Sequence, residues 1–225
     1  MKFVKAFGIA ALAALATMAI TAGTASAEAT LCTNDVAYQD IAVCDGSHGK
    51  HVKVGTKIQA ALAGGTSAVL TVTNADGSTN RVVTCTTSTA GGEITGTTGT
   101  AHISSLTFAN CSSPNCTNVT ATTPRTGKSF PWHVTVTPTS GTDGQMHVTG
   151  PSGKFTATCF FITATCEYEA ATATPVVKGG TPAVIEANAI ALNRVGGSEF
   201  ICGAKADWTA KYNISTPSSL YVTGP

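Results

Sequence analysis

The chain has 225 residues, of which 43% are hydrophobic and only 11% are charged, and its formal net charge at pH 7 is +1. An ordinary soluble domain carries about 25% charged residues, so threonine, serine, glycine and asparagine must supply most of the contact with water. The charges are balanced and form no basic cluster, which argues against a nucleic-acid partner and against attraction to an anionic membrane surface.

Residues 1–27 have the form of a secretory signal peptide. Lys2 and Lys5 make a basic start, an apolar stretch runs from Phe7 to Ile20, and the small residues Ala25-Ser26-Ala27 fit signal peptidase. The apolar stretch is shorter than the ~20 residues of a transmembrane helix, and no later stretch is long and apolar enough to span. The sequence therefore predicts cleavage after Ala27 and a secreted, extracellular chain without a membrane span.

The rest of the chain, residues 28–225, is a succession of short segments that alternate in polarity. A polar segment at 28–49 comes first, and the pair of segments around Asp76-Gly77 is the clearest hairpin signal. The expected strands lie at 52–58, on both sides of Asp76-Gly77 within 67–87, and at 101–111, 116–122, 131–137, 145–150, 154–160, 165–170, 182–193, 200–215 and 220–225. This pattern predicts a single all-β domain, an antiparallel β-sandwich or a barrel-like fold, with a polar N-terminal segment held by a disulfide.

Four aromatic side chains suggest two different roles. Trp132, Trp208, Tyr212 and Tyr221 could stack on sugars if they formed one exposed row. Trp208 and Tyr212, however, alternate with Ala206, Ala210 and Ile214 on one face of the expected strand 200–215. That face is expected to be buried, because antiparallel strands commonly bury one face only, so we favour a core position for both rings.

The eight cysteines are expected to be oxidised in pairs, because their number is even and the chain is expected to be exported. Neither a Cys-x-x-Cys redox motif nor the close spacing of a structural zinc site is present. Short connections favour the pairs Cys159–Cys166, Cys111–Cys116 and Cys32–Cys44, which leaves Cys85–Cys202. The first of these pairs requires a hairpin whose four-residue tip is Phe161 to Ala164.

That hairpin raises the question of where its apolar end lies. Phe160, Phe161 and Ile162 stand at the expected bend. They could form an exposed contact site or fold back into the core, and we expect the second, because contiguous apolar patches are uncommon on monomers.

Several segments resemble a loose group of uncharacterised, exported β proteins of actinobacteria. The resemblance rests on "CGAKADWTAKYNISTPSSLYV" near the C-terminus, on "ISSLTFANC" followed by "FPWHVTV", and on "CEY". It implies export, an all-β fold and disulfides. It implies no activity and no catalytic residues, because none is assigned to the group.

Three groups of polar residues were considered as sites. Asp45, His48 and His51 could hold a transition metal, and Asp35, Asp40 and Asp45 could offer oxygens to calcium, although their spacing is not that of a known calcium loop. Glu167 and Glu169 share a face of one expected strand, where solvation is a simpler explanation than glycoside hydrolysis. We expect no catalytic, cofactor or metal site, and whether His48 and His51 bind a metal stays open.

These observations favour a secreted, non-enzymatic β domain that acts by surface contact with an extracellular or cell-envelope ligand, such as a polysaccharide, an envelope component or another protein. The alternative is an extracellular hydrolase with a dispersed active site, since the members of a catalytic triad can be distant in sequence. The sequence determines neither the ligand nor the oligomeric state.

Overall fold

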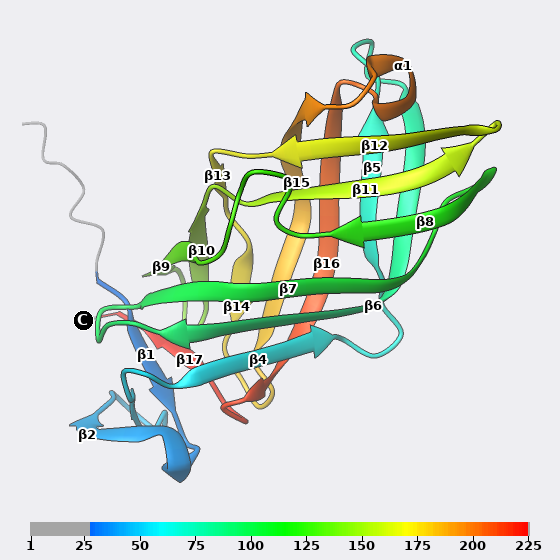
Figure 1. The fold of residues 1–225 in the computed structure, drawn as a ribbon. Helices are drawn as coiled ribbons and strands as arrows, with labels where there is room; N and C mark the ends of the chain where they lie inside the picture. The colour runs from blue at the N-terminus through cyan, green and yellow to red at the C-terminus, as the bar shows by residue number, and fades with distance from the viewer. Residues whose placement is uncertain (1–27, 225) are drawn as a thin grey trace, which may run out of the picture.

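The computed structural model describes residues 28–224, and nearly all of its regular structure is antiparallel β-strand (Figure 1). The first eight strands are β1 (Thr30–Thr33), β2 (Gln39–Val43), β3 (Lys50–Val52), β4 (Lys57–Leu62), β5 (Ala68–Thr73), β6 (Thr79–Ile94), β7 (Thr100–Ser112) and β8 (Cys116–Thr122). The others are β9 (Trp132–Pro138), β10 (Gly144–Thr149), β11 (Ser152–Cys159), β12 (Ile162–Glu169), β13 (Thr172–Ala173), β14 (Val176–Lys178), β15 (Val184–Gly196), β16 (Lys205–Thr216) and β17 (Tyr221–Thr223). The predicted all-β antiparallel fold is confirmed.

Helix is confined to two short pieces in this part of the chain, the 3-10 helix η1 (Val36–Tyr38) and α1 (Glu199–Cys202). Neither approaches the length that a helix needs to cross a bilayer. The expected signal peptide, 1–27, and its cleavage after Ala27 lie outside the described residues.

The strands follow the alternation of the sequence. In β9, Trp132, Val134 and Val136 are buried, whereas His133 and Thr135 between them are exposed. Successive side chains of a strand point to opposite faces, so the apolar set covers the core and the polar set meets water. The segment 182–193, which is rich in alanine and could also suit a helix, is largely β15 and confirms the prediction of a strand.

The larger sheet closes on itself twice. Four long strands, β6, β7, β15 and β16, exchange neighbours midway along their length; β16, for example, pairs with β5 through Lys205–Thr209 and with β4 through Tyr212–Thr216. With β4, β9, β10 and β14 they form a first ring, and with β5, β8, β11 and β12 a second ring. Within residues 28–224 each ring thus has eight antiparallel strands, and the fold is the barrel-like form of the prediction.

A second, smaller sheet orders its strands β17-β1-β3-β2 and joins the two ends of the described chain. Its apolar residues Leu31 and Val222 are buried in the common core. In Figure 1, β1 and β17 lie beside the ends of β4, β6 and β7. This sheet therefore covers one end of the first ring.

The eight cysteines form four disulfides, and one of the four pairs is the predicted one. The pairs are Cys32–Cys44, Cys85–Cys111, Cys116–Cys159 and Cys166–Cys202. The first was predicted, whereas the predicted pairs Cys85–Cys202, Cys111–Cys116 and Cys159–Cys166 are wrong.

The register of the β11–β12 hairpin explains the error. Cys159 stands opposite Ile162, and Cys166 opposite Phe155. The hairpin expected between the two cysteines does exist, but its tip is only Phe160-Phe161, so the cysteines are four positions out of register. Cys159 instead stands opposite Cys116 of the neighbouring strand β8.

Candidate functional site

The end of the β11–β12 hairpin carries a compact group of exposed apolar side chains. Phe160 and Phe161 expose 74% and 102% of their reference surface, and Ile162 exposes 52%. We call these three residues the apolar tip. The expectation that they fold back into the core is wrong, because a two-residue turn between two paired strands leaves its side chains no route inward.

The backbone of the tip is in a conformation that phenylalanine rarely adopts. Phe160 and Phe161 have φ angles of 50° and 68°. Positive φ at both central residues is the requirement of a type I′ hairpin turn, which normally selects Asn-Gly or Gly-Gly. A bulky residue in this region is strained, and such strain is concentrated at functional sites.

The hairpin beneath the tip is held by several cross-strand contacts. The hydroxyl groups of Thr158 and Thr163 are hydrogen-bonded at 2.8 Å, and a second pair, Thr156 and Thr165, repeats the contact at the same distance. The Cys116–Cys159 disulfide ties the last residue of β11 to β8. The tip is therefore presented on a braced support, which lowers the entropy that it would lose on binding.

Charge is scarce around the tip. The segments 82–92, 103–124 and 155–166 contain no Asp, Glu, Lys or Arg, and they include β8 and most of β11 and β12. Arg81 is close by, and its guanidinium donates to the sulfur atoms of Cys116 and Cys159. This end of the molecule can therefore leave water without stripping a carboxylate or an ammonium group of its hydration.

Other exposed apolar side chains are spread over different parts of the surface. Val36, Ile41 and Val43 belong to the segment that the Cys32–Cys44 disulfide closes, and Phe200 lies on α1 with 86% exposure. None of these four has a positive φ. They provide matched controls for the apolar tip.

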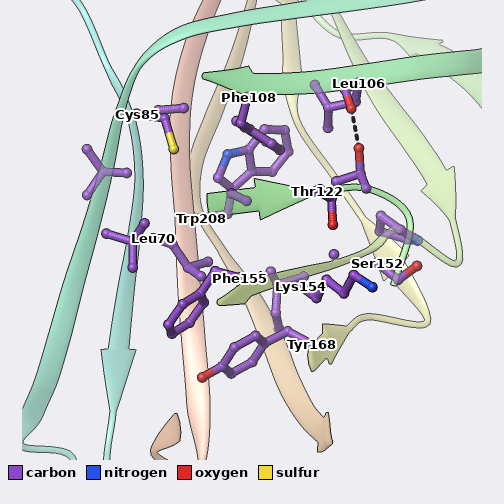
Figure 2. A pocket seen from close by; sticks show the side chains of 18 of the residues that line it. Leu70, Cys85, Leu106, Phe108, Thr122, Ser152, Lys154, Phe155, Tyr168 and Trp208 are labelled. Atoms are coloured by element: carbon purple, nitrogen blue, oxygen red, sulfur yellow. Dashed lines mark hydrogen bonds between the residues drawn. The ribbon is translucent and has the colours of Figure 1, made fainter. Parts of the chain in front are cut away.

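The interior of the barrel holds two cavities of about 80 and 110 Å³. The smaller one, shown in Figure 2, is lined by residues from every strand of the second ring, and the larger one by residues from every strand of the first ring. Leu106, Trp132, Pro151 and Trp208 line both cavities, so these residues form the layer between them. In residues 28–224 no Asp or Glu lines either cavity.

Three polar atoms in this region are buried without a hydrogen-bond partner in the described chain. They are the indole nitrogens of Trp132 and Trp208 and the hydroxyl of Ser152. Tyr212, which lines the larger cavity, differs from them because its hydroxyl is hydrogen-bonded to Ser88 at 2.8 Å. Burial raises the pKa of Tyr212 to about 12.

The four aromatic residues considered for sugar stacking do not form a row. Trp132 and Tyr212 are buried in the core, and Trp208 packs against it, as favoured for Trp208 and Tyr212 from the sequence. Tyr221 lies in the small sheet, with its ring 4.9 Å from that of His48.

The residues considered for metal binding have other partners. The Nδ1 atom of His48 is 2.9 Å from the carbonyl oxygen of Asp45, and His51 lies in β3 opposite Cys32. The Asp35 carboxylate caps η1 and accepts hydrogen bonds from Ser218, which hold the pKa of Asp35 below its usual value. Across residues 28–224, no three His, Cys, Asp or Glu side chains gather in a way that could hold a metal ion.

Glu167 and Glu169 share a face, as expected, and meet a basic turn. The Arg125 guanidinium lies 2.8 Å from Glu169 and 3.8 Å from Glu167, and Lys128 lies 3.6 Å from Glu169. The hydrogen bond from Arg125 is the main cause of a lowered pKa at Glu169. These carboxylates therefore fasten the 125–128 turn to β12.

No family model, curated protein or solved structure shows significant similarity to the chain. The resemblance to exported actinobacterial proteins thus stays a prediction. The two candidate sites, the apolar tip and the internal cavities, are accordingly defined by geometry alone. They differ in how far the sequence indicated them. Sequence reasoning raised the apolar tip as an alternative, whereas it missed the cavities, because lining residues from eight strands share no local pattern.

Proposed function

We propose that this chain is a secreted, non-enzymatic β domain that acts by surface contact, and that the apolar tip inserts into a neutral lipid surface of the cell envelope. The observation that supports this most directly is that Phe160 and Phe161 combine high exposure with a strained backbone. A folded chain gains nothing in isolation from two exposed phenylalanines in a turn that asparagine and glycine would fill without strain.

The shape of the tip narrows the choice of ligand. A convex end cannot surround a small molecule, so the tip must enter the partner. Polysaccharides are bound by aromatic rings that form a platform with hydrogen-bonding neighbours, whereas Phe160 and Phe161 stand at the end of a hairpin. An apolar layer is the simplest environment for the two rings, because amphipathic contacts of this kind bury aromatic side chains at the edge of the acyl region.

The scarcity of charge indicates neutral rather than anionic lipid. Attraction to an anionic leaflet depends on clustered Lys and Arg. The three segments around the tip contain neither, and Arg81 beside the Cys116–Cys159 disulfide is a single cation rather than a cluster. Burial of a phenylalanine side chain contributes about 1.5–3 kcal/mol, so two rings support reversible association. The attraction is hydrophobic, and added salt should not weaken it.

The test is sedimentation of the purified, disulfide-bonded chain with phosphatidylcholine vesicles. We expect the wild-type chain to co-sediment, and the variant Phe160→Asn/Phe161→Gly to lose about tenfold or more in partition coefficient. This variant supplies the residues that the turn prefers, so a loss of binding cannot be attributed to a damaged hairpin.

Two controls remove exposed apolar surface elsewhere. Phe200→Ser and Ile41→Ser/Val43→Ser are expected to bind vesicles like the wild-type chain. Equal binding by the tip variant would overturn the role of the tip. Binding that requires anionic lipid and disappears in high salt, or a glycan or a single protein as the only ligand, would overturn the assignment of a neutral lipid surface.

The hydrolase alternative stays a prediction, because no observation among residues 28–224 favours it over surface contact.

A further inference from the structure

The two internal cavities have the construction of a ligand site. Each is lined by residues from all eight strands of one ring, and in both the lining surface is almost entirely apolar. Small eight-stranded barrels are either filled by their own side chains or hold one small ligand. Here the side chains leave about 80 Å³ in the second ring and about 110 Å³ in the first.

The layer between the cavities contains hydrogen-bond donors without acceptors. Trp132 is only 6% exposed and Ser152 only 4%, yet the Nε1 atom of the first and the hydroxyl of the second are unpaired within residues 28–224, as is Nε1 of Trp208. All three residues line the smaller cavity, and both tryptophans also line the larger one. Buried indole N–H groups usually find a partner, so an acceptor is missing at this layer.

We infer that the paired cavities bind a small, neutral, mostly apolar molecule that carries one hydrogen-bond acceptor oxygen, such as a ketone or an ether. The oxygen accepts from the Trp132 or Trp208 indole, and the apolar part fills the adjoining cavity. This inference does not depend on the function proposed for the apolar tip.

The lining explains why the ligand is neutral. No Asp, Glu or Arg lines either cavity in the described residues, and His102, which lines the larger one, has its Nε2 atom 3.9 Å from the Glu93 carboxylate. Lys154 lies at the edge of the smaller cavity, but its ammonium group donates to the Thr126 hydroxyl at 3.2 Å. An ionised ligand would lose its hydration without gaining a counter-charge.

The volumes set the size of the ligand. An apolar cavity of about 150 Å³ stays dry and holds benzene, so each of these smaller cavities accommodates a group smaller than benzene. An ordered water needs two to four polar partners, and the walls offer it few. Apolar matter is therefore favoured over water, especially in the larger cavity.

The seam between β7 and β8 gives a route of entry. These strands share a single register pair, Thr107 with Thr122. Beside it, the Thr123 hydroxyl donates to the Leu106 carbonyl, the contact drawn as a dashed line in Figure 2. Leu106, Thr122 and Thr123 all line the smaller cavity, so a short opening of this seam would admit a ligand.

The chain has two tryptophans, both in this layer, which makes the test direct. The two indole ¹H–¹⁵N resonances of the folded, ¹⁵N-labelled chain are followed during titration with cyclobutanone and, separately, with methylenecyclobutane, which has the same shape without the oxygen. We expect saturable binding of both probes, and a downfield shift of at least one indole proton with the ketone only, because only the ketone accepts a hydrogen bond.

Variants distinguish the contribution of the indole ring to binding from that of its N–H group. Trp132→Phe and Trp208→Phe each keep an aromatic ring and remove one donor. The variant at the tryptophan whose indole proton shifts with the ketone should bind cyclobutanone about five- to tenfold more weakly and methylenecyclobutane as before. Ala60→Leu, which fills the larger cavity, should weaken both probes. Phe160→Asn/Phe161→Gly should bind both like the wild-type chain, whatever its behaviour on vesicles.

The inference is overturned if neither probe moves the indole resonances in a saturable way, which would show cavities that are empty or hold water only. It is also overturned if Ala60→Leu and both Trp→Phe variants bind cyclobutanone as tightly as the wild-type chain, since the probe would then lie elsewhere.

Discussion

At the scale of single residues, the two phenylalanines of the apolar tip are exposed in a turn whose backbone conformation phenylalanine does not favour. Phe160 and Phe161 occupy positive φ angles that L-residues with large side chains avoid. The paired strands on both sides, with their threonine contacts and the Cys116–Cys159 disulfide, hold them there. The strained turn therefore lowers the stability of the fold at the place where contact is proposed, and functional sites are commonly less stable than they could be.

Relief of this strain should stabilise the fold. We expect Phe160→Asn/Phe161→Gly to raise the free energy of unfolding by about 1–2 kcal/mol, because both residues suit the type I′ turn. Urea denaturation of the oxidised protein measures the change. Phe200→Ser, an exposed position without positive φ, should stay within about 0.5 kcal/mol of the wild-type value. A tip variant less stable than the wild-type chain would show that the rings pack on the hairpin and are not strained.

At the scale of elements, ion pairs between side chains on the outer face connect neighbouring strands. The Glu186 carboxylate on β15 lies 2.9 Å from Lys178 on β14 and 3.0 Å from Lys211 on β16. The hydrogen bonds from Lys178 and then Lys211 hold the pKa of Glu186 below its usual value of 4.5. One carboxylate thus connects three strands of the first ring.

The lowered pKa of Glu186 predicts a pH-dependent stability. The unfolded carboxyl group takes up its proton at a higher pH than the folded one, so the stabilisation is complete above about pH 5 and is lost as the pH falls through the lowered pKa. Glu186→Gln should be less stable than the wild-type chain at neutral pH, and the gap should close in acid.

Urea midpoints measured from neutral pH down to pH 3 provide the test. Glu28→Gln, at an exposed residue before β1, serves as the control and should show no comparable gap. A gap that stays constant over the whole pH range would contradict the role given to the ion pairs.

At the scale of the whole molecule, the small sheet acts as the end cover of the first ring. Leu31 of β1 is 5% exposed and lines the larger cavity, together with Leu220 beside β17. Strands from the two ends of the chain therefore close the barrel together. The larger cavity is therefore closed only when the strands from both ends of the chain have paired.

Shortening Leu31 tests that closure. Leu31→Ala should cost about 2–4 kcal/mol of unfolding free energy, since it enlarges a cavity that is already present. It should also shift binding in the indole titration towards probes larger than cyclobutanone. Val222→Ala is the matched control, because Val222 is fully buried in the same sheet and does not line either cavity. It should lower stability without changing the preferred probe size, and equal binding profiles for the two variants would contradict the cover.

The local part of the fold followed from the sequence. Alternation of the kind seen in Trp132, Val134 and Val136 has period two, and it reports directly which face of a strand is buried. The Asp76-Gly77 hairpin and the short Cys32–Cys44 loop were predictable for the same reason, because the deciding residues are neighbours in the chain.

Local sequence patterns thus sufficed to predict an all-β chain of alternating strands with eight paired cysteines. The other three cysteine pairs, the closure of the sheet into two rings and the position of the cavities became known from the three-dimensional structure. The physical reason is that strand partners are chosen by long-range register. Cys116 meets Cys159 because β8 lies beside β11, and Trp132 and Trp208 line the same cavity because strands distant in sequence surround one interior. No local pattern of residues carries that information.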